Sequence, residues 1–326
     1  MRIAVIGGGA VGCLVAARLA AVAPETALVV RRPAAAAAIR RGGLSLTTPN
    51  GRVVRTPLTV TDDPVALGPR DAVLLCVKAH DLPGVLHHLS PLTGPDTVVV
   101  PILNGIPWWY PVDQPAPLSG RTLTSVDPGG VLSAAIDPDR VIGAVTHVAV
   151  ERHGDDAIRH VKGERFVFGD PAGRSTPALS ALVDVFGRAG FDAQATPVIR
   201  QAIWIKLWGN LCFNPISVLT GARMDALCHD PGTRQVAARM MTESRAVAER
   251  LGITLSASID ERIAMAAEIG AFKTSMLQDY EAGRRLELDA ILGAVLELAD
   301  RVGVEVPTLR TIHALTELRA RSRAAS

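Results

Sequence analysis

In the first half of the chain, short apolar runs alternate with helix-prone segments, as in α/β domains. Runs rich in β-branched residues predict strands at 2–6, 26–30, 71–77, 97–103, 141–150 and 164–168. Alanine- and leucine-rich segments predict helices at 11–21, 34–41 and 177–189. Alternating residues on both sides of Asn50-Gly51 predict an antiparallel hairpin there.

From Arg200 onward, apolar positions recur at helical spacing and no strand alternation is visible. The segments 234–252 and 287–304 are both amphipathic in this sense. The pattern therefore predicts a doubly wound α/β domain over 1–196, followed by an all-α domain over 197–326.

Residues 7–12 read GGGAVG and match the pattern G-x-G-x-x-G between a predicted strand and a predicted helix. Gly7 allows a tight turn, Gly9 lets a pyrophosphate approach the backbone, and Gly12 lets the helix pack against the strand. The helix start offers N–H groups and a positive dipole end to phosphates. We predict a Rossmann-type dinucleotide site formed by Gly7, Gly9, Ala10, Val11 and Gly12.

Other interpretations of this stretch are a secretory signal peptide, a chance cluster of glycines, or a flavin-binding turn. Arg18 interrupts the apolar run, and the triple glycine would break the hydrophobic region of a signal peptide. Cofactor binding is therefore the favoured interpretation.

The second predicted strand ends in Arg31-Arg32-Pro33. NAD-binding sheets carry a carboxylate at this point, which binds the ribose 2′-hydroxyl. Here arginines replace it, and a guanidinium can grip a 2′-phosphate with two hydrogen bonds. The sequence predicts NADP(H) as the cofactor, although two arginines could also merely solvate the end of a strand.

Lys78 and Asn104 follow two further predicted strands, at 71–77 and 97–103. In open α/β sheets, ligands lie at the carboxyl ends of the strands. We therefore expect Lys78 to neutralise phosphate and Asn104 to hydrogen-bond ribose or substrate. A surface lysine and an Asn-Gly turn are the structural alternatives.

Lys206, Asn210 and Asn214 are spaced by four residues within an otherwise apolar segment, so a helix would place them on one face. Burying such groups is costly unless something pairs with them. Pro215 disfavours helical geometry at Asn214, which would free the amide for a cap or a ligand. This polar stripe of Lys206, Asn210 and Asn214 could face a substrate. Alternatively, the lysine extends its ammonium group to solvent and an asparagine caps a helix.

The bulk composition narrows the function class. The chain has 326 residues, 48% of them hydrophobic, and a net charge of +2 without a basic run, which argues against nucleic-acid binding. No apolar segment is long enough to demand a membrane span. The four cysteines form no C-x-x-C pair and the histidines form no metal-binding spacing, so we expect no metal and a reducing cytoplasm. The apolar helices of the second domain could pack against each other or form a homodimer.

The chain resembles the ketopantoate reductase family (2-dehydropantoate 2-reductase) nearly from end to end. The resemblance rests on GGGAVG, CVKAHDL, LNGIP, WIKLWGNLCFNPIS and KTSMLQDYEAGRRLELD, of which the second and last are distinctive. It implies NADPH-dependent reduction of a small-molecule 2-oxo acid, 2-dehydropantoate, to (R)-pantoate, a step toward pantothenate and coenzyme A.

The resemblance also implies roles for individual residues. Lys206 matches the catalytic lysine that protonates the ketone oxygen. Residues matching the substrate site are Asn210, Asn214 and Ser275. Residues matching the cofactor site are Arg31 near the 2′-phosphate, Lys78, Asn104 and, near the nicotinamide, Glu287. An ammonium in a partly apolar site has a lowered pKa, which makes it a better acid, and a carboxylate such as Glu287 opposes that shift.

Two features depart from the family pattern. Trp108-Trp109-Tyr110 follow the Asn-Gly turn and could fill, cap or reshape the pocket, and Met224 stands where many members have an asparagine. Reduction of another 2-oxo acid, or NADPH sensing without turnover, are therefore the alternative functions.

Overall fold

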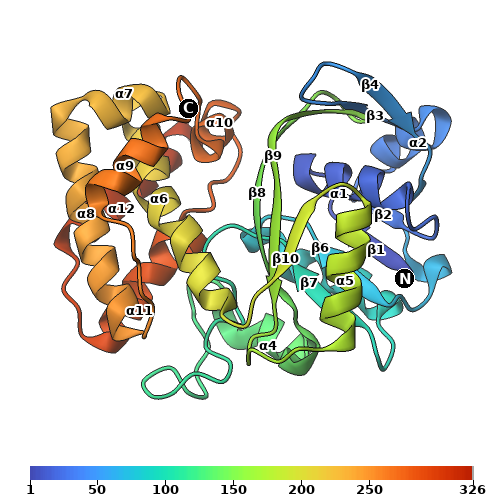
Figure 1. Cartoon of the computed structure of the whole chain (residues 1–326), viewed down its shortest axis with the longest axis horizontal. Coiled ribbons are helices and arrows are strands. Elements are labelled where there is room, and N and C mark those ends of the chain that lie inside the picture. Colours follow the sequence, from blue (N-terminus) through green and yellow to red (C-terminus); the bar gives the residue numbers. More distant parts are fainter. Residues whose placement is uncertain (325–326) are drawn as a thin grey trace. The chain divides into compact units, whose positions relative to one another are not determined.

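The computed structural model describes residues 1–324 as two compact units (Figure 1). Unit 1 comprises Met1–Leu103 and Gly130–Ile199, and unit 2 comprises Asn104–Gly129 and Arg200–Ser326. The chain therefore passes from one unit to the other three times.

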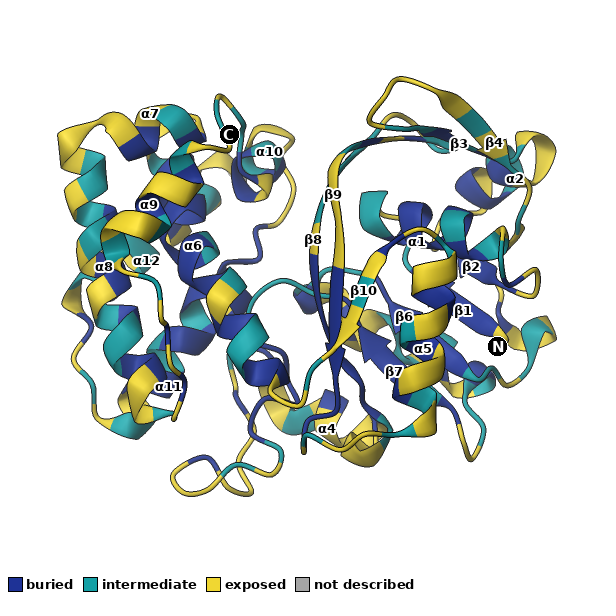
Figure 2. Ribbon diagram, in the orientation of Figure 1, coloured by how far each residue is buried: buried dark blue, intermediate teal, exposed yellow. Residues whose placement is uncertain are grey.

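Unit 1 contains a five-stranded parallel sheet. Its order is β5 (Thr59–Thr61), β2 (Ala27–Val29), β1 (Ile3–Ile6), β6 (Ala72–Leu75) and β7 (Val98–Pro101). Strands β1 and β6 are buried at every residue (Figure 2), as continuous apolar runs require when both faces of a sheet are covered. The strand order reverses between β1 and β6, and such a reversal is the usual ligand position in this class of sheet.

A second sheet completes the strands of unit 1. Its members are β10 (Asp192–Ala195), β9 (Ala157–Gly169), β3 (Leu44–Thr47), β4 (Val53–Thr56) and β8 (Gly143–Arg152), which pairs with β9. The predicted hairpin is confirmed, because β3 and β4 are antiparallel around Asn50-Gly51. Strand β5 joins the parallel sheet instead of extending β4. Strand β10 was not predicted, since its residues DAQA offer no apolar run.

The helices of unit 1 are α1 (Ala10–Ala20), α2 (Pro33–Gly42), α3 (Leu86–Leu89), α4 (Val131–Ala135) and α5 (Pro177–Arg188). Helix α1 contacts β1 and β2 of the parallel sheet as well as β3, β8 and β9 of the second sheet. Residues Cys13 to Ala17 are therefore buried, as expected for a helix that has little polar face. The predicted α/β class of the N-terminal part is confirmed.

Unit 2 is helical, as predicted. Its helices are α6 (Ile199–Thr220), α7 (Met224–His229), α8 (Pro231–Arg250), α9 (Ile259–Ala267), α10 (Ser275–Glu281), α11 (Ala294–Val302) and α12 (Pro307–Ala324). A single π-helical turn, η7 (Asp289–Gly293), precedes α11. Among the described helices, none combines the length and hydropathy needed to span a bilayer.

The predicted boundary at 196/197 would leave residues 104–129 in the first domain, whereas the structure groups them with the helices. Hydrogen bonds explain this grouping. The Tyr110 hydroxyl accepts from Trp204 Nε1 at 2.7 Å, and Arg200 Nε donates to the Tyr110 carbonyl at 3.0 Å. Farther along, the Glu297 carboxylate accepts from the backbone N–H of Ser125 at 2.9 Å.

Trp108, Trp109 and Tyr110 are all core residues, exposed by no more than 3%. The Arg200 guanidinium lies 5.6 Å from the ring centres of both Trp109 and Tyr110, a cation–π distance. Burial raises the pKa of Tyr110 to about 12. The rings thus anchor residues 104–129 to α6, which favours a packing role over a pocket-lining one.

Tyr110→Phe removes the acceptor of the buried Trp204 indole. We expect a loss of about 1–3 kcal/mol in unfolding free energy, because the N–H stays buried without a partner. Urea denaturation measures this. Tyr280→Phe is the matched control, since its hydroxyl makes no hydrogen bond to residues 1–324; equal losses in the two variants would contradict the explanation.

Candidate functional site

The glycine turn after β1 has a closed side and an open side. Gly7 has φ +122°, and a Cβ there would lie 2.6 Å from the Cys76 carbonyl oxygen. A Cβ at Gly12 would lie 2.0 Å from the Gly7 oxygen. Gly9 is exposed, and its nearest such neighbour is 3.8 Å away. Turn and helix packing therefore require glycine at 7 and 12, and the open side lies at Gly9.

Helix α1 begins at this open side. Its N-cap is Gly9, which supplies no side-chain hydrogen bond, and Ala10 and Val11 form the half-buried first turn. The first N–H groups of a helix have no partner inside it. Unit 1 thus presents free donors and a positive dipole end, a combination that fits a pyrophosphate.

The two arginines after β2 differ in their surroundings. Arg32 forms an ion pair with Asp155, whereas Arg31 is exposed and forms no ion pair within residues 1–324. No acidic residue follows the strand directly, so the end of β2 suits a 2′-phosphate better than a ribose hydroxyl. Lys78 is half-buried three residues beyond the end of β6, where it begins a short 3-10 turn.

In unit 2, three predicted site residues form a continuous hydrogen-bonded chain. Lys206 Nζ, on α6, donates to Asn104 Oδ1 at 2.8 Å. Asn104 Nδ2 in turn donates to Glu287 Oε2 at 3.4 Å. Glu287 is only 9% exposed, while Lys206 and Asn104 are half-buried. Each of these two hydrogen bonds therefore joins residues that lie more than a hundred positions apart in the sequence.

The Lys206 ammonium is tuned by its surroundings. Burial lowers the pKa of Lys206 to about 8, and the negative charge of Glu287 opposes this shift. The prediction of a lowered pKa with an opposing carboxylate is confirmed. Near neutral pH the group is mostly protonated, yet it releases its proton far more readily than an ordinary lysine.

A close backbone contact sets the position of Asn104. The next residue, Gly105, has φ +84°, and a Cβ there would lie 2.3 Å from the Ala290 carbonyl oxygen. The same oxygen accepts from the N–H of Ile106 at 2.8 Å. Ala290 belongs to η7, three residues after Glu287, so this contact places Asn104 beside the carboxylate.

Asn210 and Asn214 lie on α6 with Lys206, and Asn210 is half-buried. Asn214 is 5% exposed, and its Nδ2 has no hydrogen-bond partner within residues 1–324. The predicted loss of helical geometry at Asn214 is wrong, because α6 continues through Pro215. Tight packing of the neighbouring residues compensates for the hydrogen bond that proline removes.

Sequence reasoning missed two residues that connect Asn214 with Ser275. Ser217 Oγ donates to the Asn214 carbonyl at 2.6 Å and lies 2.6 Å from Thr274 Oγ1. Thr274 is the N-cap of α10, whose first residue is the exposed Ser275. The signal was present, since Ser217 extends the polar stripe of Lys206, Asn210 and Asn214 by one more turn.

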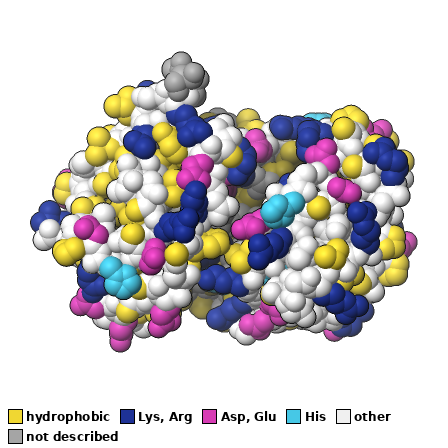
Figure 3. All heavy atoms as spheres, turned by 90° about the horizontal axis from the view of Figure 1, so that it is seen from above, with side chains coloured by type: hydrophobic (Ala, Val, Ile, Leu, Met, Phe, Trp, Pro, Cys, Tyr) yellow, Lys and Arg dark blue, Asp and Glu magenta, His cyan; other side chains and the backbone are white. Residues whose placement is uncertain are grey.

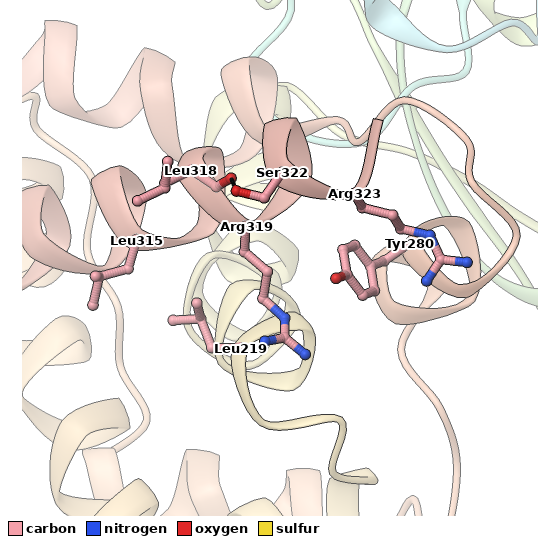
Figure 4. Close-up of a pocket in the computed structure, with 7 residues that line it drawn as sticks. All are labelled: Leu219, Tyr280, Leu315, Leu318, Arg319, Ser322 and Arg323. Atoms are coloured by element: carbon pink, nitrogen blue, oxygen red, sulfur yellow. Dashed lines mark hydrogen bonds between the residues drawn. The ribbon is translucent and has the colours of Figure 1, made fainter. Parts of the chain in front are cut away.

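One described pocket lies elsewhere in unit 2. It is lined by Leu219, Tyr280, Leu315, Leu318, Arg319, Ser322 and Arg323 (Figure 4). Arg319 and Arg323, from α12, lie 5.3 and 4.8 Å from the Tyr280 ring centre. No predicted substrate residue lines it, so it is separate from the Lys206 chain.

Two remaining features concern metals and surface charge. Within residues 1–324, no three His, Cys, Asp or Glu side chains are grouped to hold a metal ion. On the face in Figure 3, Lys and Arg side chains are interspersed with Asp and Glu.

Comparison with known proteins assigns the chain to a family. The family model described as "Ketopantoate reductase PanE/ApbA" matches residues 3–173, and its C-terminal counterpart matches residues 198–320. The chain belongs to the ketopantoate reductase family. The family resemblance inferred from the sequence motifs is thereby confirmed.

Individual members of the ketopantoate reductase family match over nearly the whole chain. A curated 2-dehydropantoate 2-reductase from Mesorhizobium japonicum is 42% identical over 315 residues, covering 97% of this chain and 96% of that protein. A protein from Ralstonia solanacearum MolK2 whose crystal structure is known shares 40% sequence identity with this chain. The two structures align with a TM-score of 0.92 over 99% of this chain and 98% of that chain. The 2-dehydropantoate 2-reductase from Methylococcus capsulatus is 30% identical with a TM-score of 0.83, covering 100% and 99%.

Gly105→Ala tests the contact that positions Asn104. The added methyl group would overlap the Ala290 oxygen, so we expect a loss of about 1–3 kcal/mol in unfolding free energy beyond the cost of the backbone conformation. Gly120→Ala is the matched control, because Gly120 has φ +66° with nothing within 4 Å of a Cβ. Equal midpoints for the two variants in thermal denaturation would exclude the contact as the cause.

Proposed function

We propose that this chain catalyses the NADPH-dependent reduction of 2-dehydropantoate to (R)-pantoate, a step of pantothenate and coenzyme A synthesis. The observation that carries the proposal is the Lys206–Asn104–Glu287 chain, in a protein 42% identical to a curated 2-dehydropantoate 2-reductase. The reaction needs a hydride donor, a proton donor and a site for a carboxylate.

Lys206 is the proton donor. NADPH, held by the residues of unit 1 described below, would supply the hydride for the ketone carbon, so that negative charge develops on the ketone oxygen. The Lys206 ammonium gives that oxygen its proton and regains one from solvent. The 2.8 Å hydrogen bond to Asn104 Oδ1 limits the rotation of the ammonium, and Glu287 keeps it charged near neutral pH. A positioned donor of this kind lowers the barrier because negative charge develops on the oxygen.

Asn210, Asn214 and Ser275 bind the substrate. The buried Asn214 Nδ2 lacks a partner within residues 1–324, and a buried amide without a partner is costly. A substrate carboxylate or hydroxyl would satisfy it. Ser275 joins the same site through the Ser217–Thr274 hydrogen bond, which fixes the start of α10.

Unit 1 binds the cofactor. The open side of the glycine turn at Gly9, Ala10 and Val11 receives the pyrophosphate, and the exposed Arg31 binds the 2′-phosphate. Lys78 adds positive charge past the end of β6. Asn104 and Glu287, both in unit 2, are the remaining cofactor-binding residues that the family resemblance implies.

We also propose that the protein is cytoplasmic and that it forms a homodimer. The four cysteines are all free and buried, which suits a reducing cytoplasm. Leu315 and Leu318 on α12 are 50% and 56% exposed, which supports a homodimer through the helical unit. Light scattering coupled to gel filtration measures the mass in solution.

NADPH oxidation at the nicotinamide absorbance band tests the function. We expect turnover with 2-dehydropantoate well above that with a panel of other 2-oxo acids. A higher kcat/KM for another 2-oxo acid would show that this other acid is the substrate. NADPH binding without turnover of any acid would instead indicate an NADPH sensor.

Lys206→Ala removes the proton donor. We expect kcat to fall by about 10²–10⁴-fold, the usual contribution of a general acid, with NADPH affinity retained. Lys162→Ala, an exposed lysine of β9 in unit 1, is the control for loss of one charge. Full turnover in a folded Lys206→Ala variant would exclude Lys206 from the mechanism.

The pH profile tests the protonation state of Lys206. Because the donor must be protonated, kcat should be level below its pKa and fall as pH rises through about 8. Glu287→Gln removes the charge that raises this pKa, so the fall should move to lower pH. A fall at the same pH in both proteins would mean that another group titrates.

A further inference from the structure

Arg152 is the last residue of β8, and it lies at the cofactor end of unit 1. Isolated parallel bridges join Val99 to Val141 and Ile102 to Ala144, so β8 runs in the same direction as β7. Its final residue therefore lies toward the carboxyl ends of the parallel strands, where ligands bind in such sheets.

The Arg152 guanidinium reaches the glycine turn. Its Nη1 donates to Cys13 Sγ at 3.2 Å, in the first turns of α1. A Cβ placed on Gly8 would lie 3.6 Å from the same nitrogen. The other two nitrogens hold the guanidinium in place, Nε on the Gly154 carbonyl and Nη2 on the Asp155 carbonyl, both at 2.8 Å.

The charge of Arg152 is not balanced by an acidic side chain. Its acceptors are two carbonyls and a thiol, and it forms no ion pair within residues 1–324. The nearby Asp155 carboxylate is paired with Arg32 instead. A half-buried cation beside the positive end of a helix is unfavourable unless an anion lies next to both.

We propose that Arg152 is a cofactor-binding residue that contacts the pyrophosphate at the glycine turn. This inference rests on the proposed binding of NADPH to unit 1. The β8–β9 turn thereby becomes part of the cofactor site, with the carbonyls of Gly154 and Asp155 orienting the guanidinium. Asp155 is a positioning residue that occupies Arg32, which leaves the 2′-phosphate to Arg31.

NADPH and NADH titrations of the full chain, followed by quenching of protein fluorescence, test the assignment. Both cofactors contain the pyrophosphate, so Arg152→Met should raise both dissociation constants by about 10- to 100-fold, the loss expected for a charge-assisted hydrogen bond. Arg152→Lys keeps the charge without the planar fork, and a smaller rise is expected.

Arg140→Met is the matched control. Arg140 precedes β8 at its opposite end, where it donates to the Gly94 carbonyl at 2.7 Å, and its loss removes the same charge from the same unit. We expect the affinity for both cofactors to stay within twofold. Circular dichroism and melting temperature establish that each variant folds. If Arg152→Met does not fold, the affinities of Arg152→Lys are used for the test instead.

Three results would overturn the assignment. Unchanged affinity in folded Arg152→Met excludes the contact, equal losses in Arg140→Met indicate a general charge effect, and a loss confined to NADPH moves the contact to the 2′-phosphate. Failure of the unmodified chain to bind NADPH would instead contradict the proposed function.

Discussion

Lys206 lies on a helix whose neighbouring side chains are nearly all apolar, so its ammonium group needs a hydrogen-bond partner that fixes its orientation. Asn104 supplies an oxygen at 2.8 Å, and Glu287 supplies the compensating charge behind it. Much of unit 2 serves this arrangement. The Gly105 contact with Ala290 fixes the amide, and the Trp108–Tyr110 rings attach the same segment to α6. The polar chain is thus held in place by an apolar core.

The glycine turn of unit 1 differs in character from the Lys206 chain, because it presents unpaired backbone donors and positive charge to solvent. Gly7 and Gly12 bring strand and helix so close that no side chain fits between them, and the exposed Gly9 leaves the start of the helix uncovered. Around this point, Arg32 is paired with Asp155, whereas Arg31 and Arg152 form no ion pair with any of the described residues 1–324. Such a division lets a surface be cationic locally without a large net charge.

The strands and helices of unit 1 could be predicted because their signals are local, such as the β-branched run of β1 and the glycines after it. Residue types at spacings of four likewise predicted the stripe of Lys206, Asn210 and Asn214. The pairing of Asn104 with Lys206 could not be predicted from residues alone, since it depends on a backbone contact to Ala290 far along the chain. The prediction at Pro215 was wrong for a related reason, because tertiary packing outweighed the tendency of proline to disfavour helical geometry at the preceding residue. The boundary at 196/197 assumed contiguous domains, whereas residues 104–129 group with the helices.

The last of these features bears on how the protein can be divided or recombined. Because the helical unit is assembled from two separate stretches, a fragment that starts near residue 197 would lack Asn104 and the three buried rings. Exchange of helical halves between relatives would therefore succeed only when the short inserted stretch travels with them. Inheritance of Lys206 and of its amide partner Asn104 is coupled by packing, although the two residues are encoded far apart.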